Sequence, residues 1–133
     1  MTRYLSLAEF WYLAEHVTGI DAATFIKASR VELADSALHA PQAGFGDTDF
    51  YPDPYDKAAV LACRIAWNHP LPDGNKRAAW ACLVLFIDLN SGSWHDENPE
   101  PDDAVEATLA VAAREIDEAW LAIWLRARVT FRT

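Results

Sequence analysis

Positive charge is scarce in this sequence. Its 133 residues include 11 Lys and Arg but 20 Asp and Glu, which gives a formal net charge of −9. Contact with a nucleic-acid backbone needs a basic face, so this balance argues against direct binding of DNA or RNA. An acidic surface suits a basic protein partner, and it also keeps a chain soluble.

Cysteine and long apolar runs are scarce as well. Cys63 and Cys82 each lie in an apolar segment, which favours buried free thiols and a reducing cytoplasm over a disulfide framework. No apolar run reaches the roughly 18 residues that a membrane span needs. Residues 1–4 lead directly into an amphipathic pattern, without the features of a signal peptide. We therefore expect a cytoplasmic protein with no membrane contact.

Apolar and aromatic side chains are abundant. Hydrophobic residues make up 52% of the chain and six of the residues are Trp, which is enough for a packed core. The length predicts one domain, residues 1–133. Periodicity and capping signals predict helices at about 7–17, 22–28, 30–39, 55–68, 75–90, 103–113 and 115–127.

Several local signals set the bounds of these helices. Residues 6–9 read as a capping box, and Gly19 should end the first helix. Residues 41–54 predict a loop or a strained hairpin, and residues 93–102 predict a loop with Asp103 as the next cap. On the last helix the stripe expected to face the core, or else to form a groove for a partner helix, consists of Ile116, Ala119, Trp120, Ile123 and Trp124.

The densest chemistry lies in segment 69–77, His-Pro-Leu-Pro-Asp-Gly-Asn-Lys-Arg. Apolar segments 58–67 and 78–89 flank it, which predicts two central, buried helices joined by a short polar loop. Pro70 and Pro72 prevent a continuous helix through that loop. The site residues therefore stand between the two stiffest elements of the fold.

The start of the second of these helices is a potential anion site. Asp73 or Gly74 begins the helix, and its first-turn N–H groups have no partners within it. Lys76 and Arg77 stand at the end where the helix dipole disfavours cations, and a phosphate bound between them would explain their position. Gly74 lets the backbone come close to such a ligand.

Three neighbouring polar side chains would complete a transfer site. His69 can act as a base near neutral pH. Asp73 can hold a magnesium ion on the phosphate, or it can cap the helix. Asn75 either fixes the loop through its amide or contacts the ligand, and Asn68 either orients His69 or ends the preceding helix. Together these residues predict transfer chemistry on a nucleotide.

Segment 69–77 resembles the signature of the Fic/Doc superfamily, roughly His-x-Phe-x-Asp-Gly-Asn-(Gly or Lys)-Arg. AMP-transferring Fic enzymes usually carry Gly at the position of Lys76 and a second Arg at the position of Trp80. This chain therefore resembles the Doc branch, the death-on-curing toxins, over about residues 20–125. The pattern in 41–59, from Pro41 through Lys57-Ala58-Ala59, agrees with that likeness.

The resemblance implies an all-α fold, a bundle of about six to seven helices with a short flap or hairpin before the central helix pair. It implies the toxin of a type II toxin–antitoxin system, a kinase that uses ATP and Mg²⁺ to phosphorylate a hydroxyl on a translation factor, elongation factor Tu in the type member, and so arrests growth. A cognate antitoxin, with a segment that covers the groove near the site, would be its partner.

The resemblance also assigns roles to residues. His69 would take the proton from the acceptor hydroxyl, and Asp73 would hold magnesium. A flap in 41–54, with Phe45 and Gly46, would align the target by strand addition. The residues expected to bind the nucleotide phosphates are Gly74, Asn75, Lys76 and Arg77.

Two other functions stay open. Adenylyl transfer would use the same histidine and aspartate, although the second Arg is absent. A non-catalytic partner-binding module would need neither Asp73 nor Lys76. The chain also departs from the Doc type member, with Trp67 in place of an Arg and Ala81 in place of an Asn, and Arg64 could supply the missing cation. A match of residues 93–98 to the short pattern of Fic inhibitory helices is interpreted as chance.

Overall fold

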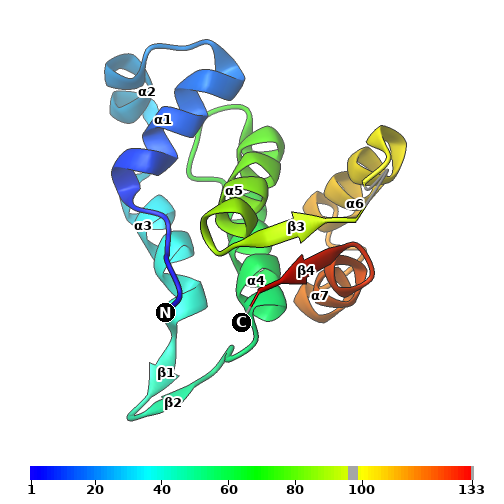
Figure 1. Cartoon of the computed structure of the whole chain (residues 1–133). Helices are drawn as coiled ribbons and strands as arrows, with labels where there is room; N and C mark the ends of the chain where they lie inside the picture. Colours follow the sequence, from blue (N-terminus) through cyan, green and yellow to red (C-terminus); the bar gives the residue numbers. More distant parts are fainter. Residues whose placement is uncertain (96–98, 133) are drawn as a thin grey trace.

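A computed structural model shows seven α-helices and two short two-stranded antiparallel sheets within the residues that it describes, 1–95 and 99–132 (Figure 1). This is the all-α bundle that was predicted. Within the same residues, no helix combines the length and the apolar character that crossing a bilayer requires. The helices are α1 (Leu7–Thr18), α2 (Ala22–Ala28), α3 (Val31–His39), α4 (Pro54–Asn68), α5 (Asn75–Leu89), α6 (Pro101–Ala112) and α7 (Glu118–Arg126).

Helices α4 and α5 form the centre of the molecule, as their apolar sequences predicted. α4 packs against α5, α7 and α3, and α1 covers another side of α5 (Figure 1). Cys63 of α4 and Cys82 of α5 are both buried and free. Burial raises the pKa of each thiol to about 12, so both stay protonated at neutral pH. The predicted buried free thiols are confirmed.

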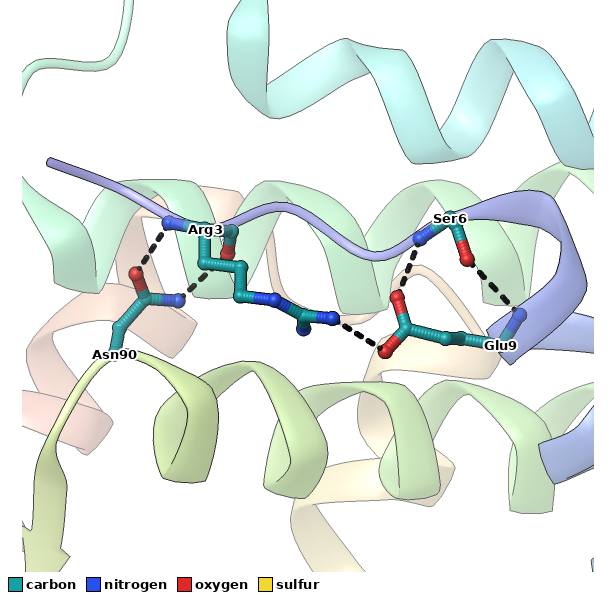
Figure 2. A network of polar contacts seen from close by, with 4 residues as sticks. All are labelled: Arg3, Ser6, Glu9 and Asn90. Carbon is teal, nitrogen blue, oxygen red and sulfur yellow. Dashed lines mark hydrogen bonds and ion pairs between the residues drawn. The ribbon is translucent and has the colours of Figure 1, made fainter.

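A polar network fixes the start of α1 (Figure 2). The hydroxyl of Ser6 accepts from the backbone N–H of Glu9, and the Glu9 carboxylate accepts from the backbone N–H of Ser6 at 2.9 Å, which is the predicted capping box. Arg3 donates to the same carboxylate at 3.0 Å. The side-chain amide of Asn90 brackets Arg3, accepting from its N–H at 2.7 Å and donating to its carbonyl at 2.8 Å. These bonds tie the start of α1 to the end of α5.

The next turns also follow their local signals. α1 ends at Gly19, which has φ 74°, the left-handed conformation that glycine adopts without strain. Asp21 caps α2 by accepting from the backbone N–H of Thr24. After α3, a short 3₁₀ turn over Ala40–Gln42 contains Pro41 and ends the helical run.

The predicted hairpin before the central helices is present. Strands β1 (Gly44–Phe45) and β2 (Thr48–Asp49) are antiparallel. Lys57, in the second turn of α4, is only 2% exposed and anchors the hairpin. Its ammonium donates to the carbonyl of Pro41 at 3.2 Å and lies 3.6 Å from the Asp49 carboxylate. Lys57 therefore attaches the hairpin to the beginning of α4.

The prediction of a continuous loop over 93–102 was wrong. Gly92–Trp94 forms strand β3, which pairs with β4 (Val129–Phe131) in a two-stranded antiparallel sheet. Pairing between segments so distant in sequence leaves no local signal. α6 also begins earlier than predicted, at Pro101 with Glu100 as its cap instead of Asp103. The pattern noted over 93–98 starts inside β3, and its residues 96–98 lie outside the described part of the chain.

The predicted core stripe of the last helix is confirmed only in part: Trp124 is buried and Ile116 packs against the core, whereas other members of the stripe are exposed. α7 begins at Glu118, with Asp117 as its cap, and not at 115. Trp120 is 42% exposed and Ile123 is 65% exposed. Apolar residues lie on two sides of this helix, so its sequence alone does not determine which side faces the core. In the structure, the buried side is the one that packs against α4. The buried residues of α7 are Leu121, Ala122, Trp124 and Leu125.

Candidate active site

The connection between α4 and α5 holds the candidate site. α4 ends at Asn68, and His69 caps it in the left-handed backbone conformation, with φ 49° and ψ 56°. The chain then turns inward, so Pro70 and Leu71 are buried while His69 stays exposed. Among the described residues, no hydrogen bond engages its imidazole. The predicted loop therefore presents a free imidazole at the surface.

Gly74 starts α5 in a conformation that suits glycine. Its φ is 80°, and a β carbon there would lie 2.7 Å from Cγ2 of Thr18 at the end of α1. Among the described residues no side chain caps this helix end. The first-turn N–H groups of Asn75, Lys76 and Arg77 have no carbonyl partner within the helix. The start of α5 thus offers N–H donors and the positive end of the helix dipole.

The side chain of Asn75 belongs to the loop. Its Oδ1 accepts from the N–H of Leu71 and its Nδ2 donates to the carbonyl of Leu71, both at 2.9 Å. The amide therefore fixes the loop, one of the two alternatives that the sequence left open. What Asn75 can offer a phosphate is its backbone N–H.

Asp73 is exposed and does not cap α5. Its carboxylate lies 3.7 Å from the guanidinium of Arg77, with side chains 79% and 58% exposed. Within the described residues, no cluster of three or more His, Cys, Asp or Glu side chains could hold a metal alone. Magnesium bound with a nucleotide usually takes one or two carboxylates plus phosphate oxygens. A lone carboxylate beside the N–H donors of α5 fits that donor set, and metal binding by Asp73 stays a prediction.

The two cations in the first turn of α5, Lys76 and Arg77, have different surroundings. Arg77 donates to the carbonyl of Val17 at 2.9 Å, near the C-terminal end of α1, where the helix dipole favours a positive charge. Arg77 therefore has a structural role, because it joins the start of α5 to the end of α1. Lys76 is exposed and makes no ion pair with any described residue. Lys76 is the cation whose position a bound anion would best explain.

A cavity of about 690 Å³ opens beside the start of α5. α5 forms its floor, α6 forms one wall, and Val17 at the end of α1 lies at its edge. Its lining is almost entirely apolar apart from the two cations, and His69 is not part of it. The structure therefore brings both cations to the cavity and leaves the imidazole at the other end of the connection. The residues that matter for its chemistry are Lys76, Arg77, Trp80, Ala81, Val105 and Leu109.

Two of the positions that depart from the family pattern, Trp67 and Trp80, are occupied by packed aromatic rings. The ring of Trp80 lies 5.9 Å from that of Trp94 and 6.3 Å from that of Trp124. Trp67 donates its indole N–H to the carbonyl of Val111 at 2.7 Å. Arg64 contacts the Tyr51 hydroxyl and the Glu118 carboxylate at 3.4 and 3.5 Å. It therefore points away from the loop, and the idea that it replaces a missing cation there was wrong.

The structure does not bring Phe45 and Gly46 to the imidazole. The hairpin adjoins the beginning of α4, whereas His69 follows its last residue (Figure 1). α4 has 15 residues, so about 22 Å of helix separates the two. The role of these residues as a flap that aligns a target beside the nucleotide does not fit this arrangement. Phe45 is nevertheless 83% exposed.

Sequence reasoning missed two residues that contact the loop. Val17 accepts from Arg77, and Arg30 donates to the carbonyls of His69 and Pro70. Both come from the first third of the chain, and neither carries a local signal for this role. The amide of Asn68 donates to the carbonyl of Leu33 at 3.1 Å, so it holds the end of α4 to α3 instead of contacting the imidazole.

Comparison with known proteins agrees with this arrangement. The model of the Fic/DOC family matches residues 4–87, more than half of the chain and all of segment 69–77. The chain therefore belongs to the Fic/DOC family. It is also similar to Toxin Doc of Mycolicibacterium smegmatis, with 41% identity over 85 residues, 64% of this chain and 65% of that protein. The likeness thus covers just under two thirds of the length of that relative.

Proposed function

We propose that this chain is a Doc-type toxin that transfers the γ-phosphate of ATP to a hydroxyl group of another protein and so arrests growth. The main observation behind this proposal is the connection between α4 and α5. It bears the family signature, presents an exposed imidazole, and ends at a helix start with free N–H groups and an unpaired Lys76 among the described residues. Membership in the family and the likeness to a protein named Toxin Doc support the proposal.

In the proposed reaction, His69 accepts the proton of the acceptor hydroxyl. The oxygen attacks the γ-phosphorus, a new P–O bond forms, the bond to the bridging oxygen of the β-phosphate breaks, and ADP leaves. Lys76 and the first-turn N–H groups of α5 offset the negative charge of the phosphates. Magnesium held by Asp73 would neutralise further phosphate charge. Most of the acceleration comes from orientation and charge stabilisation, both of which need a rigid loop.

The surroundings of Trp80 favour phosphoryl over adenylyl transfer. AMP-transferring relatives use a second Arg at this position, and here an indole ring packs against Trp94 and Trp124. The three indole rings carry no charge, so this cluster supplies no cation near Lys76 in place of that second Arg.

The test is a transfer reaction run with two labels. Purified protein is incubated with a cell lysate and ATP labelled at either the γ- or the α-phosphate. We expect γ-label on a protein, loss of labelling with His69→Ala, and retention with the matched surface variant His39→Ala. Mass spectrometry of the labelled band identifies the acceptor, for which the resemblance favours a translation factor. Label from the α-phosphate would establish adenylyl transfer instead, and no label from either position would leave only partner binding.

We further propose that an antitoxin segment covers the cavity beside α5. Val105 and Leu109 of α6 line it and are 56% and 50% exposed, an apolar wall that a partner would bury. Co-expression with the neighbouring gene should relieve growth arrest. Val105→Asp and Leu109→Asp should weaken that relief while toxicity persists. Ile123→Asp, at a more exposed apolar position on α7, serves as the control and should leave the relief intact.

A further inference from the structure

The backbone of His69 is held in a conformation that a residue with a β carbon disfavours. Its φ of 49° and ψ of 56° lie in the left-handed region. In the described part of the chain, Ser91 and Arg114 are the other non-glycine residues with positive φ. A histidine directly before a proline would more readily adopt an extended conformation. Contacts from elsewhere must therefore hold this turn.

Arg30 supplies two such contacts. Its guanidinium Nη2 donates to the carbonyl of His69 at 3.1 Å, and its backbone N–H donates to the carbonyl of Pro70 at 2.8 Å. One residue, 39 positions earlier in the chain, thus binds two successive carbonyls of the connection. Two bonds to adjacent peptide groups fix both the position and the rotation of the turn, which one bond could not do.

The local structure of Arg30 makes this possible. It is the residue before α3, where the backbone N–H is not needed for a helical hydrogen bond. α3 itself is anchored in the core through its buried residues Ala34, Ala37 and Leu38. The two donors of Arg30 are therefore presented by a rigid element and not by a free loop.

The remaining contacts on the connection do not reach His69. Asn75 holds Leu71, two residues further on. Asn68 holds the last turn of α4 to Leu33, on the helical side of the histidine. Neither of these bonds determines the torsion angles of His69 itself. Among the described residues, the contacts that act at that peptide come from Arg30.

We propose that Arg30 is a positioning residue for His69: by binding the carbonyls of His69 and Pro70, it keeps the histidine in its left-handed turn and so aims the imidazole. The inference rests on the proposed transfer reaction for its kinetic consequence, but the geometry that it describes is independent of that reaction. Arg30 acts through His69 and touches neither the acceptor nor the nucleotide.

The experiment compares Arg30→Ala and Arg30→Lys with two control variants. Lys27→Ala removes an exposed charge from the end of α2, three residues away. Asn68→Ala removes a side-chain bond between α4 and α3 without touching the carbonyls of His69 and Pro70. The first readout is the set of ¹³Cα and ¹³Cβ chemical shifts of His69 in labelled full-length protein, which report its backbone conformation. The second is the rate of γ-label transfer against ATP concentration.

With Arg30→Ala we expect the His69 shifts to move towards extended values. We expect kcat to fall roughly 100-fold with KM for ATP unchanged, because a small misplacement of a reacting group costs about that much. Both variants keep the backbone bond to the carbonyl of Pro70, so the comparison tests the guanidinium bond to the carbonyl of His69. Arg30→Lys also keeps a side-chain donor and should restore part of both signals. Both controls should keep the His69 shifts and kcat of the wild type.

Unchanged His69 shifts in Arg30→Ala would overturn the inference, as would an equal fall in kcat with Lys27→Ala. If Arg30→Ala does not fold, Arg30→Met, which keeps an unbranched side chain and removes the donor, is measured by the same two signals, and wild-type values in both would again overturn the inference. If the wild type transfers no label at all, the proposed function fails. The chemical shifts of His69 then decide the positioning role alone.

Discussion

The side-chain amide of Asn75 forms a closed pair with the backbone of Leu71, accepting from its N–H and donating to its carbonyl at 2.9 Å each. Asn75→Asp keeps the acceptor but replaces the donor with a second oxygen, which faces a part-buried carbonyl. We expect a loss of about 1–3 kcal/mol in the free energy of unfolding. The helix dipole returns only about 0.3–1 kcal/mol for an acid at this end.

Urea denaturation of the wild type and of Asn75→Asp measures that loss. The matched control is Asn90→Asp, which disturbs a similar bracket of the Arg3 peptide at the far end of α5. Asn90→Asp should lose a similar amount of unfolding free energy and should keep the wild-type rate of γ-label transfer. An unchanged midpoint for Asn75→Asp would show that the pair contributes nothing to stability.

Lys76 and Arg77 should separate stability from activity. Arg77→Ala loses the bond to the Val17 carbonyl and should cost about 0.5–1.5 kcal/mol of unfolding free energy. Lys76→Ala loses no bond to a described residue and should stay within about 0.5 kcal/mol of the wild type. Transfer of γ-label by Lys76→Ala should nevertheless fall roughly 100-fold. A destabilised but fully active Lys76→Ala protein would contradict the phosphate-binding role.

Glu9 should contribute to the pH dependence of stability. Its hydrogen bond from the backbone N–H of Ser6, assisted by the side chain of Arg3, lowers the pKa of the Glu9 carboxyl from its ordinary value of 4.5. A carboxyl whose pKa is lower in the folded state adds stability that is fully present above the unfolded pKa. That stability is lost as the pH falls through the folded value.

The Glu9→Gln variant isolates this effect, because Gln also serves in a capping box. We expect the wild type to be more stable than the variant at about pH 6, and the difference to close on acidification below about pH 4. Thermal unfolding across this pH range measures it. A constant difference between the two proteins would show that the Glu9 charge has no part in stability.

The inward face of α7 can be tested with two alanine substitutions. Leu121 is buried to 2% exposure, whereas Ile123 is 65% exposed. Leu121→Ala should cost about 2–5 kcal/mol through lost burial and a cavity, and Ile123→Ala should stay within about 0.5 kcal/mol of the wild type. Chemical denaturation of the two variants checks this. Equal losses would return Ile123 to the core stripe that the sequence predicted.

Much of the fold could be predicted because its signals are local. The capping box at Ser6 and the left-handed turn at Gly19 each act within a few residues, and the structure has both. The β3–β4 sheet and the buried side of α7 could not be predicted in this way. Both depend on partners distant in sequence, such as Val129 opposite Trp94.

The same distinction holds for the candidate site: the parts set by a local sequence pattern could be predicted, and the parts set by distant contacts could not. The loop with His69, the helix start after Gly74 and the exposed cation Lys76 follow from one continuous segment, and the structure places them as expected. The support from Arg30 could not be foreseen, because a guanidinium that binds a carbonyl 39 residues away leaves no pattern. The hairpin with Phe45 adjoins the opposite end of α4 from His69, a separation that the predicted helix over 55–68 already implied.

The bracket that Asn90 forms around Arg3 has a practical consequence for assays. It anchors the beginning of the chain at the end of α5, about 22 Å of helix away from Gly74 (Figures 1 and 2). An affinity tag or a fluorescent reporter fused before Met1 would therefore project away from the imidazole and from the start of α5. Pull-downs and growth assays made with such a fusion should report on an unobstructed catalytic surface.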